Sequence, residues 1–252
     1  KALDRFHVTG LVWSYIHDPA VISEVCNSGR FFQGAVTNSL ATVRDLLGLP
    51  RKMTPAEADA FIRKYACLSL DGSPNEQPWK RHWPNPLSRC SGCCSNPEFE
   101  NLYVNALQTY VDAGATMIQR DEGSGNAHRP SYGGCFCDHC MHGFRAFLKK
   151  TRTPEQLVAL GIQDIASFDY RLRLRKDGAP VGDDFARWDG GRLKERFVEY
   201  QHRVSVEFMA RTRAGLNENA GFDVAMSCNN GVSRFDEIMQ QFDWFFGERK
   251  RS

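Results

Sequence analysis

The 252-residue chain lacks several features that would place it in a specialised class of protein. No apolar run approaches the roughly 18 residues that a membrane-spanning helix needs, so no membrane partner is expected. The 32 basic and 30 acidic residues leave a formal net charge of only +2, which argues against nucleic acid as a partner. Internal repeats and low-complexity segments are also missing. The remaining composition, 42% hydrophobic and 25% charged, is typical of a globular protein with a sizeable core.

The cysteines are not dispersed along the chain as those of a disulfide framework usually are. There are nine, an odd number and a high one for this length. Six of them form two clusters, which are Cys90, Cys93 and Cys94, and Cys135, Cys137 and Cys140. The other three are predicted to be buried small hydrophobic residues, and they are Cys26, Cys67 and Cys228. Clustering of this kind favours a metal site.

The second cluster has the spacing C-x-C-x-x-C, which places three thiolates in one tight loop. Such thiolates hold a soft metal or carry out redox chemistry. Zinc takes four ligands in tetrahedral geometry, and Cys140 gains from its place at the start of a predicted helix, whose dipole favours a thiolate. Free thiols or disulfides are the alternative. His139, inside the motif, is expected to be a solvated bystander.

Apolar runs and capping residues predict an alternation of strands and helices. Strands are expected over residues 7–13, 31–37, 115–122, 223–227 and 242–248, with a further short one at 68–70. Helices are expected over residues 18–29, 54–67, 97–113, 140–150, 192–219 and 235–241, with a short one opening at Thr153. Residues 71–96 are interpreted as a long functional loop and residues 175–191 as a polar connection.

About six alternating strands and helices predict an α/β fold with a parallel sheet. A (β/α)8 TIM barrel fits best, because polar and carboxylate residues gather at the carboxyl ends of the predicted strands. The barrel is expected to be incomplete at the C-terminus, so residues 1–252 are interpreted as one domain and a probable fragment, with a metal-binding loop insertion around residues 90–140. A doubly wound open sheet is the alternative, although no G-x-G-x-x-G loop follows the first strand.

Residues 118–150 resemble the fourth-strand region of clan-A glycoside hydrolases, especially the family 42 β-galactosidases. In that family a strand ending in Asn-Glu precedes a C-x-C-x-x-C loop and a helix of the form C-x-x-x-F-R-x-x-L. The matching residues here are Asp121, Glu122, Cys135, Cys137, Cys140, Phe144, Arg145 and Leu148. Asp121 departs from the family's Asn, and the family's nucleophile strand has no clear counterpart. Glycosidase-like proteins with the same cysteine loop are therefore closer than a true β-galactosidase.

The resemblance also implies a structural zinc ion. The family's three loop cysteines bind zinc together with one upstream cysteine, which lies shortly before a proline that begins a helix. Cys93 stands four residues before Pro97 and is the best match for this fourth ligand, with Cys94 as the near competitor. A cytoplasmic location would follow from a zinc–thiolate site. A secreted or periplasmic location is the alternative if a signal peptide was removed, because the chain has no initiator methionine.

Glycoside hydrolysis needs two carboxyl groups that flank the scissile bond. Glu122, at the end of an apolar predicted strand, is the candidate acid/base, and Glu248, which ends the last predicted strand, is the candidate second carboxylate. Asp121 is the third candidate; it points to the other side of a regular strand and would pair with Arg120 or a neighbour. Other candidates bind substrate. Trp13, Asn38, Asn229 and Asn230 lie at other predicted strand ends, and Trp244, like Trp13, could stack on a sugar face.

These patterns predict a glycosidase that acts on an oligo- or polysaccharide, with a structural zinc ion as its metal. A non-catalytic carbohydrate-binding or degenerate barrel protein with a structural zinc site is the alternative. A zinc-dependent nucleic-acid module is a third reading, and the near-neutral charge counts against it. The expected partner is therefore a carbohydrate, and the sequence leaves open a homo-oligomer.

Overall fold

The computed structural model describes residues 5–50, 52–121, 123–229 and 236–246 of the chain. The chain divides into two compact units, each assembled from separate stretches of sequence. The first unit comprises Lys1–Thr54, Glu100–Gly123 and Val206–Ser252, and the second comprises Pro55–Phe99 and Ser124–Ser205.

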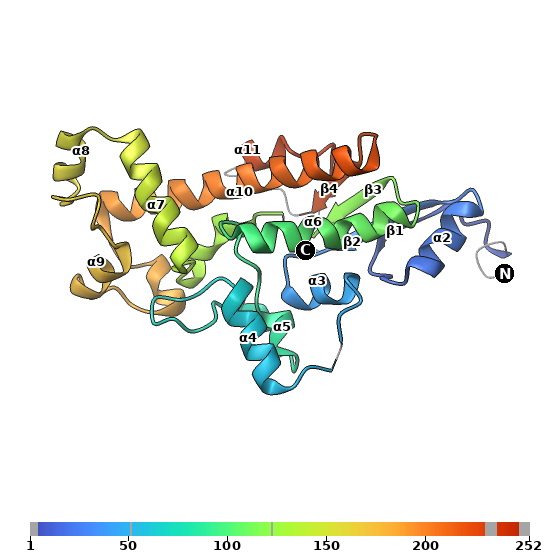
Figure 1. The fold of residues 1–252 in the computed structure, drawn as a ribbon, viewed down its shortest axis with the longest axis horizontal. Helices are drawn as coiled ribbons and strands as arrows, with labels where there is room; N and C mark the ends of the chain where they lie inside the picture. The colour runs from blue at the N-terminus through green and yellow to red at the C-terminus, as the bar shows by residue number, and fades with distance from the viewer. Residues whose placement is uncertain (1–4, 51, 122, 230–235, 247–252) are drawn as a thin grey trace, which may run out of the picture. The chain divides into compact units, whose positions relative to one another are not determined.

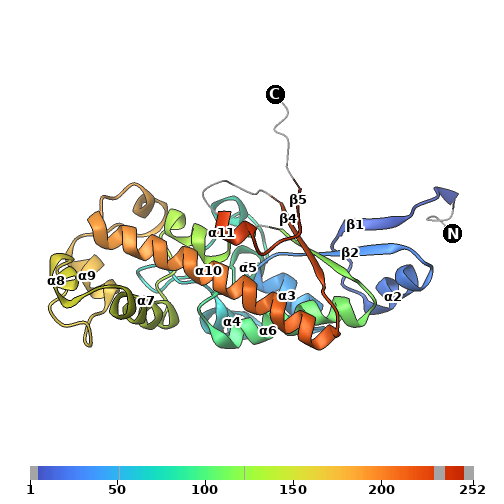
Figure 2. The same ribbon diagram turned by 90° about the horizontal axis from the view of Figure 1, so that it is seen from above.

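The first unit contains a five-stranded sheet whose strands are all parallel and follow one another in chain order (Figures 1 and 2). The strands are β1 (Gly10–Ser14), β2 (Phe31–Val36), β3 (Met117–Arg120), β4 (Ala225–Asn229) and β5 (Trp244–Phe246). Because parallel strands point the same way, their carboxyl ends share one edge of the sheet. Sites in parallel α/β sheets are built at this edge.

Strand β2 shows why this sequence forms a buried strand. Its sequence is apolar except for Gln33 and Gly34, and every residue after Phe31 is buried. A Cβ atom at Gly34 would lie 2.7 Å from the ring of Tyr110, so a side chain there would displace the ring. The Tyr110 hydroxyl donates a hydrogen bond to the Ala35 carbonyl at 3.0 Å. The glycine thus permits a close contact that ties the helix carrying Tyr110 to the strand.

A row of polar side chains crosses the sheet on one face. Gln33 of β2 donates to Ser227 Oγ of β4 at 2.8 Å, and Ser227 also bonds to Gln119 of β3. Gln33 Oε1 accepts the backbone N–H of Trp13 in β1 at 3.0 Å. All three polar side chains are fully buried, so each needs such a partner. The network fixes the register of four neighbouring strands.

The helices of the first unit are α2 (Pro19–Asn27), α3 (Leu40–Leu46), α11 (Asp236–Met239) and the later parts of α6 (Pro97–Asp112) and α10 (Gly191–Ala220). Helix α2 begins where the sequence predicts, because Asp18 accepts the backbone N–H of Ala20 at 2.9 Å and Pro19 occupies the first turn. Within the described ranges, every helix is too short or too polar to cross a membrane.

The second unit is built from helices and long loops around an aromatic core. Its elements are α4 (Pro55–Tyr65), η1 (Pro78–Lys80), α5 (Pro86–Arg89), η2 (Gly125–Tyr132), α7 (Asp138–Thr151), α8 (Pro154–Ala159), α9 (Tyr170–Lys176), η3 (Gly182–Ala186) and the first part of α10. Phe136 stacks on Phe197 of α10 at 5.1 Å, and Phe144 of α7 meets the same ring edge-on at 5.2 Å. These rings pack the loop before α7 against α10.

The structure confirms a parallel α/β arrangement and corrects several details. A complete eight-stranded barrel is not formed by the described residues, which contribute five strands rather than about six. The expected strand at residues 68–70 is absent as a strand from the described chain, because Leu68 and Ser69 make only isolated bridges with Pro74 and Gly134. The sequence patterns also missed α3 and α9, and the supposed connection at 175–191 contains η3.

Candidate functional site

Four cysteine sulfurs meet in the second unit and form what is called here the four-cysteine cluster: Cys93, Cys135, Cys137 and Cys140. All four residues are buried, and their sulfur atoms lie within 4.8 Å of one another. Cys93 Sγ is 3.5 Å from both Cys137 Sγ and Cys140 Sγ, and 3.7 Å from Cys135 Sγ. None of the nine cysteines forms a disulfide with another, so no disulfide competes for these sulfurs.

Local structure brings each cysteine to the cluster. Cys137 is the residue that caps α7, and Cys140 lies in the first turn of that helix. Cys93 is held by its backbone N–H, which donates to the Tyr65 carbonyl at 2.8 Å. Cys135 follows Gly134, where a Cβ atom would lie 2.6 Å from the Asn75 side chain, so glycine is needed for this close approach. The cluster therefore joins two segments more than 40 residues apart in the sequence.

The spacing of the sulfurs fits a tetrahedral metal ion. Zn–S bonds of about 2.3 Å at tetrahedral angles put ligand sulfurs about 3.8 Å apart, close to the observed 3.5–3.7 Å from Cys93. Cys94 was the competing candidate for the fourth ligand. It does not belong to the four-cysteine cluster, and its backbone N–H instead donates to Asn126 Oδ1 at 3.0 Å. The geometry favours Cys93.

The sulfurs influence one another's ionisation. Burial opposes ionisation of Cys93, but hydrogen bonds from Cys135, Cys137 and Cys140 hold the pKa of Cys93 well below its ordinary value. Burial, with hydrogen bonds to the other sulfurs, raises the pKa of Cys140 well above its ordinary value. Without a metal ion the cluster therefore keeps part of its protons, and a cation that binds there must displace them.

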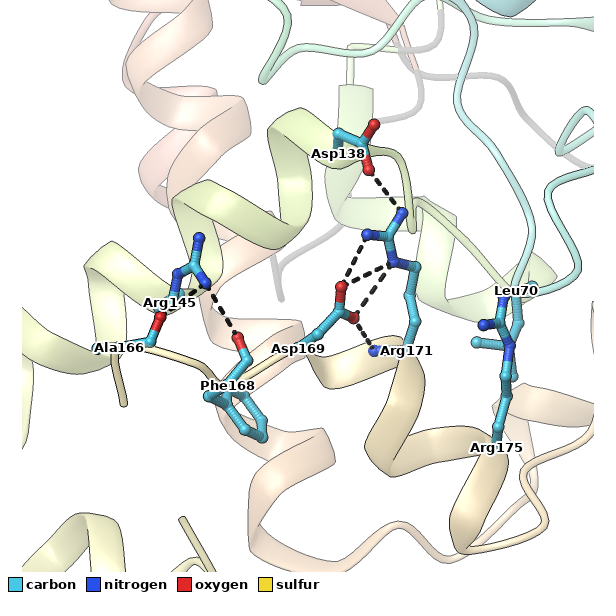
Figure 3. A network of polar contacts seen from close by, with 8 residues as sticks. All are labelled: Leu70, Asp138, Arg145, Ala166, Phe168, Asp169, Arg171 and Arg175. Carbon is cyan, nitrogen blue, oxygen red and sulfur yellow. Dashed lines mark hydrogen bonds and ion pairs between the residues drawn. The ribbon is translucent and has the colours of Figure 1, made fainter. Parts of the chain in front are cut away.

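Charged side chains anchor helix α7, which carries Cys140 (Figure 3). Arg171 of α9 donates to Asp138, which lies between two cluster cysteines, at 2.7 Å, and also to Asp169 at 2.7 Å. Hydrogen bonds from Arg171 lower the pKa of Asp169. Arg145 of α7 donates to the carbonyls of Ala166 and Phe168 at 3.0 and 3.5 Å. These contacts fix the first turns of α7 against the segment that leads into α9.

Replacing Arg145 with Met is expected to lower the free energy of unfolding by about 1–2 kcal/mol, because Met keeps the aliphatic stem but loses charge-assisted hydrogen bonds. Urea denaturation followed by circular dichroism measures this. Arg187→Met is the matched control, because Arg187 pairs with Asp184 at the surface with 82% of its side chain exposed. It is expected to change the free energy of unfolding by less than about 0.5 kcal/mol. Equal effects of both variants would contradict an anchoring role for Arg145.

The candidate carboxylate site belongs to the first unit. Glu122, Asn230 and Glu248 lie outside the described residues. Asp121 directly follows β3, and its backbone N–H donates to the Val36 carbonyl of β2 at 2.8 Å. Its carboxylate accepts the hydroxyl of Tyr15 at 2.7 Å, a partner that the sequence did not suggest. Asp121 is therefore held at the carboxyl edge of the sheet by the segment after β1.

The other candidates are distributed along the same strands. Trp13 lies in β1 with a positive φ of 51°, where the pairing with β2 shifts register between Leu11 and Ser14. Irregular strands of this kind re-aim side chains and are common beside active sites. Asn38 follows β2 and Asn229 ends β4, and both are buried. Trp244 is half exposed and begins β5, so it lies away from the carboxyl end of that strand.

Arg120 is a site residue whose actual partner sequence reasoning missed. The sequence left Asp121 to pair with Arg120 or a neighbour, but the Arg120 guanidinium is fully buried and donates instead to Asn38 Oδ1 at 2.7 Å. Its cation lies 5.3 Å from the ring centre of Tyr103 and also contacts the Met209 sulfur. Among the described residues it has no carboxylate partner. Alternation of side chains along β3 could have shown that Arg120 and Asp121 face different ways.

Comparison with known proteins adds a partial match. No family model matches the chain. An alpha-agarase of Alteromonas agarilytica is 31% identical over 113 residues, and one of Thalassotalea agarivorans is 30% identical over 112 residues. Each match covers 36% of this chain and 8% of the relative, so the chain spans a small part of the length of these curated relatives. The chain thus has a distant, partial similarity to alpha-agarases.

Proposed function

We propose that the chain is part of a glycoside hydrolase that acts on a galactan of the agar type. The observation that carries this proposal is the partial similarity to two alpha-agarases, which are glycoside hydrolases. The parallel sheet supports it, because Asp121, which precedes Glu122 in the sequence, follows β3 at the edge where such folds place their sites.

The proposed fold is a (β/α)8 barrel of which the five described strands form a consecutive part. Strands of such a barrel are all parallel and neighbour one another in chain order, as β1 to β5 do. The buried polar row of Gln33, Gln119 and Ser227 then corresponds to the side that faces inward. The helices that contact Arg120 on the other face correspond to the outer ring.

The proposed chemistry uses two carboxyl groups. Glu122 donates the proton to the leaving oxygen, and Glu248 serves as the second carboxylate, which attacks the sugar or activates water. Asp121, which the Tyr15 hydroxyl holds, orients the end of β3 beside Glu122. Trp13, Asn38, Asn229 and Asn230 are proposed to contact the sugar, and Trp244 is left out because it begins β5, away from the carboxyl end of that strand. Trp13 is the best supported of these, because its irregular backbone sets it apart from a regular strand.

The proposed cofactor is one structural zinc ion in the four-cysteine cluster. Four cysteines fill every position of tetrahedral zinc and leave none open for substrate or water, so the ion would stabilise the loop rather than take part in chemistry. Other thiophilic metal ions fit the same donors. A role in stability agrees with the position of the cluster, which ties the start of α7 to the segment around Cys93.

Incubation of the protein with agarose and agaro-oligosaccharides is expected to release new reducing ends, detected by a reducing-sugar assay and by mass spectrometry of the products. A panel of nitrophenyl glycosides, including β-galactoside, tests whether simpler linkages are cleaved. Binding to agaro-oligosaccharides in a calorimeter without any product would support the non-catalytic carbohydrate-binding alternative. If the protein neither binds nor cleaves these substrates, the proposed substrate class is wrong.

A further inference from the structure

A single asparagine, Asn126, lies at the centre of the buried sulfur groups of the second unit. It is fully buried in η2. Its Nδ2 lies 3.6 Å from Cys93 Sγ and 3.5 Å from Cys140 Sγ, distances typical of N–H donors to sulfur. Its Oδ1 accepts from the thiol of Cys67 at 3.5 Å. One amide group therefore contacts two members of the four-cysteine cluster and one cysteine outside it.

The orientation of this amide is fixed by its other neighbours. The backbone N–H of Cys94 can only donate, and it lies 3.0 Å from Asn126 Oδ1. Gln201 Oε1 accepts from Asn126 Nδ2 at 3.0 Å, and Gln201 Nε2 in turn donates to the Cys135 carbonyl at 3.1 Å. The oxygen of Asn126 must therefore face Cys94 and Cys67, and its N–H groups must face the cluster sulfurs.

Charge explains why the cluster needs such a donor. Four thiolates around a divalent cation carry a net charge of −2, and an uncompensated charge is costly in a buried site. Another donor near the sulfurs is the backbone N–H of Leu68, 3.4 Å from Cys135 Sγ, whereas Ser95 Oγ accepts from the Cys140 thiol at 3.4 Å. Asn126 is the donor placed between Cys93 and Cys140, the ligands from the two separate segments.

We propose that Asn126 is a positioning residue of the metal centre that determines which four of five neighbouring sulfurs, those of the four-cysteine cluster and of Cys67, bind the ion. Its N–H groups stabilise Cys93 and Cys140 as thiolates, and its carbonyl oxygen holds Cys67 as a hydrogen-bonded thiol outside the ligand set. The inference rests on the metal centre of the proposed function. It extends that function by assigning a residue beyond the ligands themselves, and outer partners of this kind typically change metal affinity about 10–100-fold.

The test is zinc affinity, measured in competition with a chromophoric chelator on the full chain. Asn126→Asp keeps the shape but replaces the N–H donors with a carboxylate oxygen that faces thiolates, so the zinc dissociation constant is expected to rise about 10–100-fold or more. Asn126→Ala, which removes the donors without adding charge, is expected to have a smaller effect. Asn85→Asp is the matched control, because Asn85 caps α5 by accepting an N–H through Oδ1, which Asp does equally well.

A second measurement uses cobalt, whose thiolate charge-transfer band reports the sulfur ligands directly. Cys67→Ala is expected to leave the band intensity and zinc affinity unchanged, because Cys67 lies outside the ligand set. Wild-type zinc affinity in Asn126→Asp, or loss of the cobalt band in Cys67→Ala, would overturn the inference while leaving the metal centre in place. Failure of the wild-type chain to bind either zinc or cobalt would instead overturn the proposed metal centre, and the inference with it.

Discussion

Cys93→Ser is expected to abolish tight zinc binding and to destabilise the second unit strongly, whereas Cys94→Ser is expected to keep the ion. A serine oxygen is a poor replacement for a thiolate, and the three remaining sulfurs leave the ion with an open position. Loss of a structural metal removes the free energy with which it holds two separate segments together. A loss of about 4 kcal/mol lowers the melting temperature by about 8–16 °C in a chain of this size.

Elemental analysis measures the zinc content of the two variants, and thermal melting measures their stability. Cys93 and Cys94 are adjacent and equally buried, so a general effect of placing a hydroxyl in this region appears in both. Treatment of the wild-type chain with a strong chelator is expected to lower its melting temperature to that of Cys93→Ser, and added zinc to restore it. The opposite pattern, with zinc retained in Cys93→Ser and lost in Cys94→Ser, would show that Cys94 is the fourth ligand.

The sequence predicted the elements whose signals are local. The apolar run at Phe31–Val36 and the residues Asp18 and Pro19 before α2 each mark their own structure, and both predictions are confirmed. The spacing of Cys135, Cys137 and Cys140 likewise indicated a shared site, because three ligands come from one turn of chain and the start of a helix. The resemblance to the family 42 β-galactosidases favoured Cys93, four residues before Pro97, over Cys94, but it left both open.

Elements and contacts that depend on distant parts of the chain were missed. Helix α3 has only seven residues, so its apolar periodicity is too short to be recognised. Its cap, Ser39, comes directly after Asn38, which the sequence assigned to a strand end. Residues Leu68–Leu70 are apolar enough for a strand, but no neighbouring strand of the described chain pairs with them. The contact of Arg120 with Asn38 spans 82 residues of sequence. Side-chain alternation along β3 argues against a pair with Asp121, but nothing local in the sequence points to Asn38 as the partner.

The candidate groups divide between the two units according to their proposed roles. The four-cysteine cluster and Asn126 belong to the second unit, whereas Asp121 and the residues at the strand ends belong to the first. Only three residues of sequence separate Glu122 from Asn126, so one short stretch of chain carries both a candidate acid/base and a candidate partner of the metal. Separate variants at these positions can therefore distinguish loss of chemistry from loss of metal.

Glu122→Gln is expected to remove most turnover while leaving metal content and stability unchanged. Gln keeps the shape of the side chain but cannot donate a proton to the leaving oxygen, a contribution typically worth about 10²–10⁴-fold in rate. Rates on activated aryl glycosides are expected to fall less than rates on agaro-oligosaccharides, because a good leaving group needs little protonation. Asp121→Asn is the matched control. It is expected to be milder, since the Asn oxygen can still accept the Tyr15 hydroxyl that Asp121 accepts at 2.7 Å. Equal losses in both variants on both kinds of substrate would show that Glu122 is not the acid/base, and full activity in Glu122→Gln would remove Glu122 from the mechanism altogether.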